Sequence, residues 1–160
     1  MTIKVGDKIP SVKLKHMTAS GPAEVSTDEL FAGKKVAVFA VPGAFTPTCS
    51  AKHLPGYVEK AAALKAKGVD SIVCLSVNDA WVMDAWGKAQ GVGDKVRMVA
   101  DGSGDLTRAL GLELDLKAAG LGQRSRRYSM LVENGVVKKL NLEQGGEFKI
   151  SDAETLLNQA

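Results

Sequence analysis

The chain has 160 residues and a mass of 16.8 kDa, the size of one domain, and we expect a single domain over residues 1–160. Apolar residues make up 45% and charged residues 24%, which excludes disordered and fibrous proteins. The formal net charge of +3 is too small for a nucleic-acid-binding protein. No stretch approaches the roughly 18 apolar residues of a membrane helix, and the first ten residues lack the apolar core of a signal peptide. We therefore expect a cytoplasmic protein of bacterial type or the processed form of an organelle protein.

The N-terminal part of the chain predicts peripheral elements and one central strand. Residues 3–17 alternate apolar and polar side chains, which is typical of short edge strands, and a polar stretch follows at 18–23. A capping box at 26–29 opens a short helix that Gly33 ends. The apolar run over residues 36–41 is too short for a helix and predicts a buried central strand.

A long helix should follow this strand. Pro47 suits the first helical position, and the Thr46 before it can act as the N-cap. Pro55 should kink the helix, because it lacks an amide donor, and Gly68 should end it. A second apolar run, over residues 71–77, predicts a strand parallel to the first, since a helical crossover joins the two.

The rest of the chain continues the alternation of helices and strands. The expected elements are a helix over 79–90 capped by Asn78-Asp79, a strand over 96–100, a short helix over 105–110, an antiparallel hairpin of 127–133 with 136–142, and a terminal helix over 151–159. Asn134-Gly135 favours the hairpin because both residues accept positive φ angles. A second capping box, at 151–154, opens the terminal helix. Together these elements predict an α/β fold with a mixed central β-sheet flanked by helices on both faces.

Cys49 is the first candidate for chemistry. As the third residue of the helix that begins at Pro47, it places its sulfur among amides without an intrahelical partner, at the positive end of the helix dipole. A thiolate is favoured there, although a lone cysteine is more often an inert core residue. With two cysteines, two histidines and no Cys-x-x-Cys pair, the sequence predicts no metal site.

The residues around Cys49 make the assignment specific. Residues 41–50 read VPGAFTPTCS and resemble the peroxiredoxin active-site loop, Pro-x-x-x-Thr-x-x-Cys. The segments 51–57, 76–83 and 127–130 are similar to the atypical type II subgroup, also called peroxiredoxin-5-like. The resemblance covers nearly the whole chain. It implies a thioredoxin-like fold and a thiol-dependent peroxidase that reduces hydrogen peroxide and alkyl hydroperoxides without metal, haem, flavin or other cofactor.

The resemblance also implies roles for individual residues. Cys49 would be the peroxidatic nucleophile and would pass through a sulfenic acid. Thr46 would hold the thiolate and the peroxide through its hydroxyl, and Pro42 would shield the sulfur from water. Arg127 would stabilise the thiolate and donate hydrogen bonds to the peroxide oxygens as the O–O bond breaks.

Two alternatives to this set of residues remain open. Either Arg124 or Arg126 could replace Arg127 as the charge partner of the sulfur. His53 lies four residues after Cys49 on the same helix face, so a Cys-His catalytic pair is a further alternative. The sequence shows no third group that would orient this imidazole.

Cys74 supports two interpretations. Its position in the middle of a predicted strand favours a buried, inert thiol. Its spacing from Cys49 matches a resolving cysteine proposed for plant-like type II members, which would attack the sulfenic acid and form a disulfide. Otherwise an external thiol, from glutathione with glutaredoxin or from thioredoxin, would reduce the sulfenic acid.

The assembly and function can also be anticipated. An excess of apolar residues over 81–86, together with Phe45 on the active-site loop, predicts a homodimer, which type II peroxiredoxins commonly form. No nucleic-acid or membrane partner is expected. Two rival functions are a non-enzymatic peroxide sensor or redox-regulated chaperone on the same fold, and a thiol-disulfide oxidoreductase, which the missing Cys-x-x-Cys pair disfavours.

Overall fold

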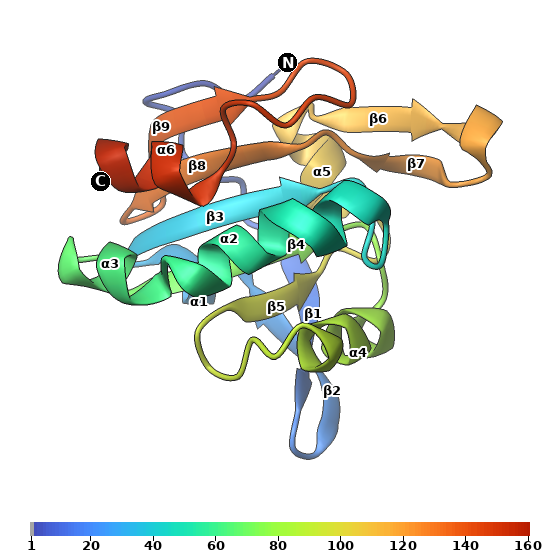
Figure 1. The fold of residues 1–160 in the computed structure, drawn as a ribbon, viewed down its shortest axis with the longest axis horizontal. Coiled ribbons are helices and arrows are strands. Elements are labelled where there is room, and N and C mark those ends of the chain that lie inside the picture. Colours follow the sequence, from blue (N-terminus) through green and yellow to red (C-terminus); the bar gives the residue numbers. More distant parts are fainter. Residues whose placement is uncertain (1) are drawn as a thin grey trace.

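A seven-stranded mixed sheet forms the centre of the protein, and the computed structural model describes residues 2–160 around it (Figure 1). In spatial order the strands are β2 (Gly21–Ser26), β1 (Lys13–Thr18), β5 (Arg97–Ala100), β4 (Ser71–Ser76), β3 (Lys35–Val41), β8 (Tyr128–Glu133) and β9 (Val136–Leu142). Strands β3, β4 and β5 run parallel, whereas β8 is antiparallel to both β3 and β9. The predicted central strands and the C-terminal hairpin are therefore confirmed.

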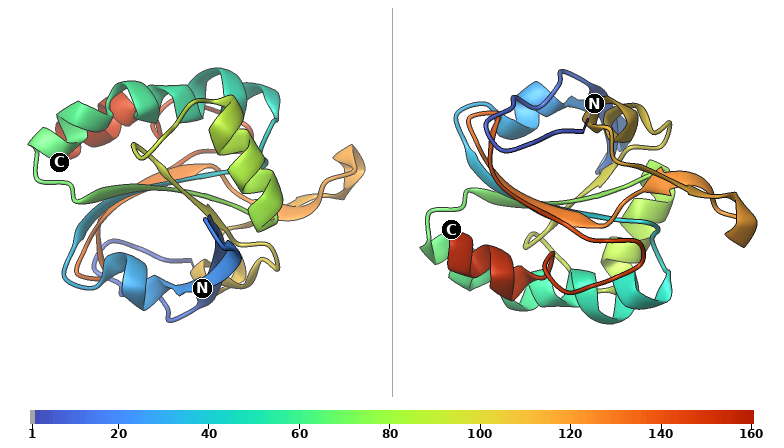
Figure 2. Two further views of the ribbon diagram at one scale, coloured as in Figure 1. Left: turned by 90° about the horizontal axis from the view of Figure 1, so that it is seen from below. Right: turned by 90° about the horizontal axis from the view of Figure 1, so that it is seen from above.

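Helices cover both faces of this sheet (Figure 2). One face carries α2 (Leu54–Glu59), α3 (Ala61–Ala66), α4 (Ala80–Ala89) and α6 (Ala153–Gln159), and the other carries α1 (Thr27–Phe31) and α5 (Asp105–Leu110). Because side chains alternate along β3, its odd-numbered residues from 37 to 41 pack into the first core and its even-numbered residues from 36 to 40 into the second. The fold class is as predicted. No helix within residues 2–160 is long and apolar enough to cross a membrane.

The long helix after β3 is interrupted at places that the sequence does not predict. It begins at Pro47 and widens into a π-helical turn over Cys49–His53, in which the Leu54 amide bonds to the carbonyl of Cys49. The break between α2 and α3 lies at Lys60. Pro55, where the sequence predicts a kink, is the second residue of α2 and follows this π-helical turn, so its missing amide falls where the regular hydrogen-bond pattern is already broken.

Side-chain caps fix three of the helix starts. Ser26 caps α1 by accepting the Glu29 amide at 3.1 Å, and Asp79 caps α4 by accepting the Val82 amide at 2.8 Å, both as predicted. The capping box expected at Ser151 is wrong, since the adjacent Asp152 caps α6. The Ser151 hydroxyl is thereby free to bond elsewhere.

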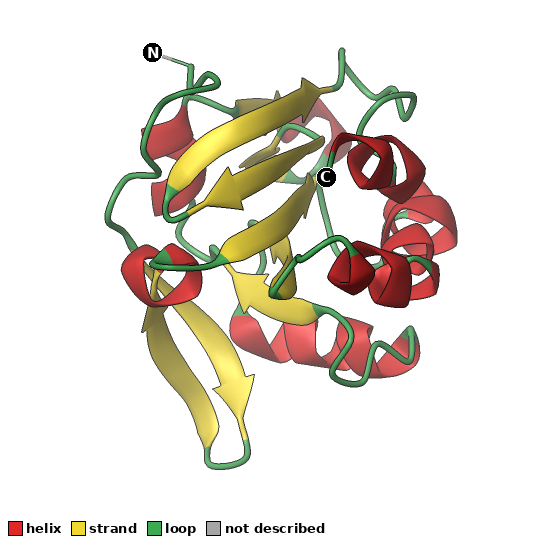
Figure 3. Ribbon diagram, turned by 90° about the vertical axis from the view of Figure 1, so that its left-hand side faces the viewer, coloured by secondary structure: helices red, strands yellow, loops and turns green. Residues whose placement is uncertain are grey.

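Two hairpins project beyond the helical layers, and the second of them forms a separate two-stranded sheet. Strands β1 and β2 form one hairpin, which reaches well past the helices (Figure 3). This hairpin includes the polar stretch at 18–23, which the sequence did not predict as a strand. The other pairs β6 (Glu113–Leu116) with β7 (Gly122–Ser125) and projects from one end of the molecule (Figure 1). This second hairpin could not be predicted from the sequence, because its strands are only four residues long and mostly polar.

Candidate active site

The carboxyl end of β3 and the amino end of β8 meet at one edge of the sheet. Ala40 of β3 lies opposite Tyr128 of β8, so Arg127 lies beside the loop that leaves β3 after Val41. This loop leads into the helix that carries Cys49. The antiparallel pairing of β3 with β8 therefore brings Arg127 close to Cys49, although the two residues are far apart in the sequence.

The Cys49 sulfur is fully buried and lies within hydrogen-bond distance of two side chains. Thr46 Oγ1 is 2.9 Å from the sulfur, and Arg127 Nη2 is 3.1 Å from it. The Thr46 hydroxyl also lies 2.7 Å from the Gly43 carbonyl oxygen. This hydroxyl faces the sulfur while the Thr46 carbonyl accepts the Ser50 amide at 3.0 Å, so Thr46 lies both at the start of the helix and in the site, as predicted.

Arg127 is 5% exposed and carries its charge inside the protein. Its Nη2 donates to the Cys49 sulfur, and its Nη1 donates to Nδ1 of His53 at 2.9 Å. No ion pair within residues 2–160 includes this guanidinium. The two rival arginines point elsewhere, since Arg126 donates to the Glu143 carbonyl and Arg124 to the Pro42 carbonyl.

His53 contacts the arginine and not the sulfur. Because a guanidinium only donates hydrogen bonds, Nδ1 must be the acceptor, and Nε2 carries the proton that it donates to the Ser151 carbonyl at 3.0 Å. Burial, reinforced by the charge of Arg127, lowers the pKa of His53 to about 3. The Cys-His pair is therefore not formed, and the imidazole is a neutral group oriented by two partners. The sequence analysis missed Ser151 as an orienting group because 98 residues separate it from His53.

Aromatic rings surround the hydrogen-bonded side chains of Arg127 and His53. The rings of Phe39 and Phe148 each lie 4.9 Å from the His53 ring, and the Arg127 Cζ lies 5.8 Å from the centre of the Phe148 ring. Tyr57 stacks on Phe39 at 4.0 Å and donates its hydroxyl to the same Ser151 carbonyl at 2.9 Å. The hydrogen bonds between the sulfur, the guanidinium and the imidazole thus lie in a largely apolar environment.

A side chain from the β6–β7 hairpin holds the loop between β3 and Cys49. Arg124 of β7 donates to the Pro42 carbonyl at 3.2 Å and to the Leu121 carbonyl at 2.9 Å. A Cβ atom at Gly43 would lie 2.8 Å from Nη1 of Arg124. The unpredicted β6–β7 hairpin therefore supports the active-site loop, and a side chain at position 43 would displace the guanidinium that holds this loop.

Comparison with known proteins agrees with this geometry. The Redoxin family model matches residues 4–157. The chloroplastic peroxiredoxin-2E-2 of Oryza sativa subsp. japonica is 58% identical over 98% of this chain and 72% of its own length. Peroxiredoxin-2B of Arabidopsis thaliana is 53% identical over 97% of this chain and 96% of its own length. Reduced Prx3 of Vibrio vulnificus, in complex with H2O2, has a TM-score of 0.95 and 52% identity, with 99% of each chain covered.

The chain belongs to the type II peroxiredoxins. This peroxiredoxin has the thioredoxin-like fold and is a thiol-dependent peroxidase, so the predicted fold, family and enzyme class are confirmed. Its substrates are peroxides and its reductant is a thiol. Within residues 2–160, no group of three or more His, Cys, Asp or Glu side chains is placed to hold a metal ion.

Cys74 lies in the centre of the sheet of this peroxiredoxin. It is opposite Phe39 of β3 on one side and Met98 of β5 on the other, and it is fully buried, as its sequence context predicted. Both cysteines are free thiols. Burial, together with the nearby Cys49, raises the pKa of the Cys74 thiol well above its ordinary value, against a smaller opposing effect of Arg127.

Two large apolar side chains are exposed near the active site. Phe45, on the loop before Cys49, is 55% exposed at a positive φ of 65°, and Trp81, on the first turn of α4, is 65% exposed. The Phe45 ring lies 6.5 Å from that of Trp86, which is buried and donates to the Ser50 hydroxyl. Burial in the core therefore explains the apolar side chain of Trp86 on α4 but not that of Trp81.

The low pKa of His53 predicts that the peroxiredoxin loses stability on acidification. Unfolded, this histidine takes up a proton near pH 6.5, whereas the folded protein resists protonation down to about pH 3. The unfolded chain therefore binds more protons in this window, and the free energy of unfolding should fall with falling pH by up to about 1.4 kcal/mol per pH unit.

Denaturant unfolding at pH values between 6.5 and 5 measures this slope before most carboxylates titrate. His53→Gln should be less stable at pH 7 but should show a shallower slope. His16→Gln, at the other histidine of the chain, should change the slope less. A His53→Gln variant with the slope of the unmodified protein would contradict the assignment.

Proposed function

We propose that Cys49 is the peroxidatic nucleophile of this enzyme. The observation that supports this most directly is the buried sulfur within hydrogen-bond distance of both the Thr46 hydroxyl and the buried Arg127 guanidinium. The Cys49 thiolate attacks the terminal oxygen of the hydroperoxide, so that an S–O bond forms as the O–O bond breaks. The other oxygen leaves with the electron pair, takes up a proton and departs as water or an alcohol, and Cys49 becomes a sulfenic acid.

The neighbouring groups act on this step in different ways. Arg127 stabilises the thiolate by its charge and, from beside the sulfur, donates to the oxygen on which negative charge develops. The Thr46 hydroxyl has one proton and two acceptors within reach, the sulfur and the Gly43 carbonyl, so it can turn from one to the other when peroxide arrives. Pro42 begins this loop and, in the proposal, limits access of water to the sulfur. The Vibrio vulnificus Prx3, solved with H2O2, supports the choice of substrate.

An external thiol is the proposed reductant of the sulfenic acid, in place of Cys74. The high pKa of Cys74 keeps it protonated near neutral pH, and a protonated thiol is a weak nucleophile. Its strand is hydrogen-bonded on both sides, so release of this sulfur requires the centre of the sheet to open. Glutathione with glutaredoxin and thioredoxin are the two candidate donors. The proposed location is the cytoplasm, a reducing compartment, although the rice relative is chloroplastic.

The first test replaces the nucleophile. Cys49→Ser should abolish peroxide turnover, because a serine hydroxyl is far less acidic than a thiol and does not ionise in the same site. Peroxide consumption with a thiol reductant in excess gives the rate, and intact mass after peroxide treatment shows whether oxygen is added. Turnover above the uncatalysed rate in this variant would remove Cys49 from its role.

A second test concerns Cys74. Cys74→Ala should keep full turnover with an external thiol, and the unmodified protein treated with one equivalent of peroxide and no thiol should gain one oxygen. Loss of two hydrogens in the unmodified protein, absent in Cys74→Ala, would instead show that Cys74 forms a disulfide and resolves the sulfenic acid. Separate assays with glutathione and glutaredoxin, or with thioredoxin, identify the donor.

We also propose that the enzyme is a homodimer that uses the face carrying Phe45 and Trp81, since both side chains are largely exposed beside the site. Phe45→Asp should shift sedimentation at micromolar concentration towards the monomer, because it places a charge in the apolar contact. Val5→Asp is a matched control, since Val5 is equally exposed but lies on the N-terminal segment. A monomeric unmodified protein, or equal effects of the two variants, would contradict this interface.

A further inference from the structure

The carboxylate of Glu143 gathers four hydrogen-bond donors on one oxygen. Its Oε2 accepts the amides of Lys149, Ile150 and Ser151 at 2.9, 2.8 and 2.7 Å, and the Ser151 hydroxyl at 2.7 Å. Glu143 directly follows β9 and is only 2% exposed. Burial alone would raise its pKa, but the Ser151 hydroxyl and the three amides outweigh it and lower the pKa below its ordinary value. The side chain is therefore a charged anchor for the loop that connects β9 to α6.

This loop delivers two groups to the active site. The Ser151 carbonyl accepts the proton of His53 Nε2, and the Phe148 ring packs on both His53 and Arg127. Because the Ser151 amide and hydroxyl are held by Glu143, the position of the neighbouring Ser151 carbonyl depends on that carboxylate. The loop has no helix or strand of its own to fix it.

Glu143 is also tied to the backbone of the arginine segment. Its amide donates to the Arg127 carbonyl at 3.0 Å, and its carbonyl accepts Nη2 of Arg126 at 3.0 Å. One residue thus fixes the main chain of Arg127 directly and, through the loop, the imidazole that accepts from the Arg127 side chain. A chain of hydrogen bonds runs from Glu143 through Ser151, His53 and Arg127 to the sulfur.

We propose that Glu143 is a positioning residue for the peroxidase reaction, which holds Ser151 and Phe148 so that neutral His53 keeps the Arg127 guanidinium against the Cys49 sulfur. The inference rests on the proposed roles of Cys49 and Arg127. Without the carboxylate, the Ser151 carbonyl moves, Nε2 of His53 loses its acceptor, and the imidazole no longer presents a fixed lone pair to the arginine. The guanidinium then spends less time beside the sulfur, so the thiolate is less favoured.

The test measures the thiolate itself as well as the rate. Glu143→Gln should lower the fraction of Cys49 present as thiolate at pH 7, followed by its ultraviolet absorbance, and slow the bimolecular reaction with H2O2 by about 10- to 100-fold. Ser151→Ala removes only the hydroxyl bond and keeps the carbonyl, so it should show the same changes to a smaller extent. If Glu143→Gln fails to fold, the thiolate fraction and the H2O2 rate of Ser151→Ala test the proposal in its place.

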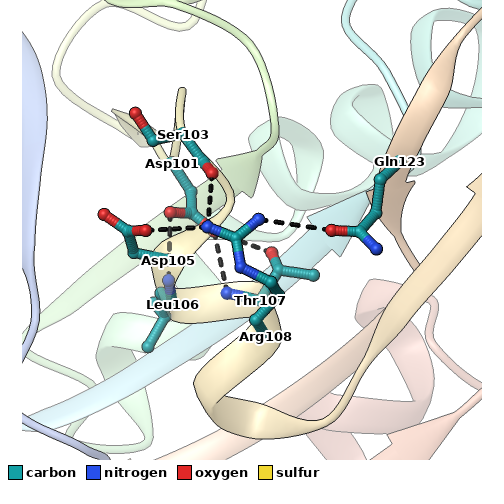
Figure 4. Close-up of polar contacts among 7 residues, drawn as sticks. All are labelled: Asp101, Ser103, Asp105, Leu106, Thr107, Arg108 and Gln123. Carbon is teal, nitrogen blue, oxygen red and sulfur yellow. Dashed lines mark hydrogen bonds and ion pairs between the residues drawn. The ribbon is translucent and has the colours of Figure 1, made fainter.

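Asp101 supplies a matched control. This carboxylate is also buried and accepts the amides of Leu106 and Thr107 and the Thr107 hydroxyl, at the start of α5 (Figure 4). Its contacts hold a helix end and do not reach the active site. Asp101→Asn should therefore lower the free energy of unfolding while leaving the thiolate fraction and the H2O2 rate within about twofold of the unmodified protein.

The outcomes separate the positioning role of Glu143 from the proposed role of Cys49. If Glu143→Gln and Ser151→Ala lose stability as Asp101→Asn does but react with peroxide at the unmodified rate, Glu143 only anchors the loop and the positioning role is wrong. If Glu143→Gln slows the reaction without changing the thiolate fraction, the proposed effect of Glu143 on the Cys49 thiolate is wrong. Should peroxide fail to oxidise Cys49 in the unmodified protein, the proposed function itself fails.

Discussion

A positive charge that is buried without a carboxylate partner among residues 2–160 is the constraint on which this site depends. Moving a cation out of water is costly unless other groups replace its hydration. Around Arg127 these groups are the Cys49 sulfur, the lone pair of His53 and the face of Phe148. Of the three, only the sulfur can acquire a negative charge. The protein therefore gains most from its buried guanidinium when Cys49 is ionised.

The state of His53 follows from the same constraint. A second positive charge at 2.9 Å from the guanidinium would repel it in surroundings that screen charge poorly. Burial and the arginine together keep the imidazole neutral, and the fixed proton on Nε2 then requires an acceptor at a defined point, the Ser151 carbonyl. The loop between β9 and α6 contains no regular structure, yet it must hold the Ser151 carbonyl in a fixed position.

The sequence was sufficient for the parts of the molecule that rest on local patterns. Apolar runs predicted the central strands, and Ser26 and Asp79 predicted two helix starts, because a cap acts within three residues. The loop motif brought Pro42, Thr46 and Cys49 to attention. Contacts between distant segments could not be predicted, such as Ser151 on His53 or Arg124 on Pro42, because nothing in a local pattern states which loops meet. The π-helical turn before Pro55 could not be predicted either, because no local pattern in the sequence indicates its wider hydrogen-bond spacing.

The close approach of Gly43 and Arg124 restricts the order in which the enzyme can accumulate substitutions. A methyl group at position 43 would come within 2.8 Å of Nη1 of Arg124, so the arginine side chain would have to move away from the Pro42 carbonyl. Shortening Arg124 first would release the Pro42 carbonyl and loosen the loop before Cys49. Replacement of Gly43 alone or of Arg124 alone is therefore disadvantageous, even where replacement of both residues could be accepted. The two positions, one in the active-site loop and one in a projecting hairpin, should covary among sequences that share this geometry.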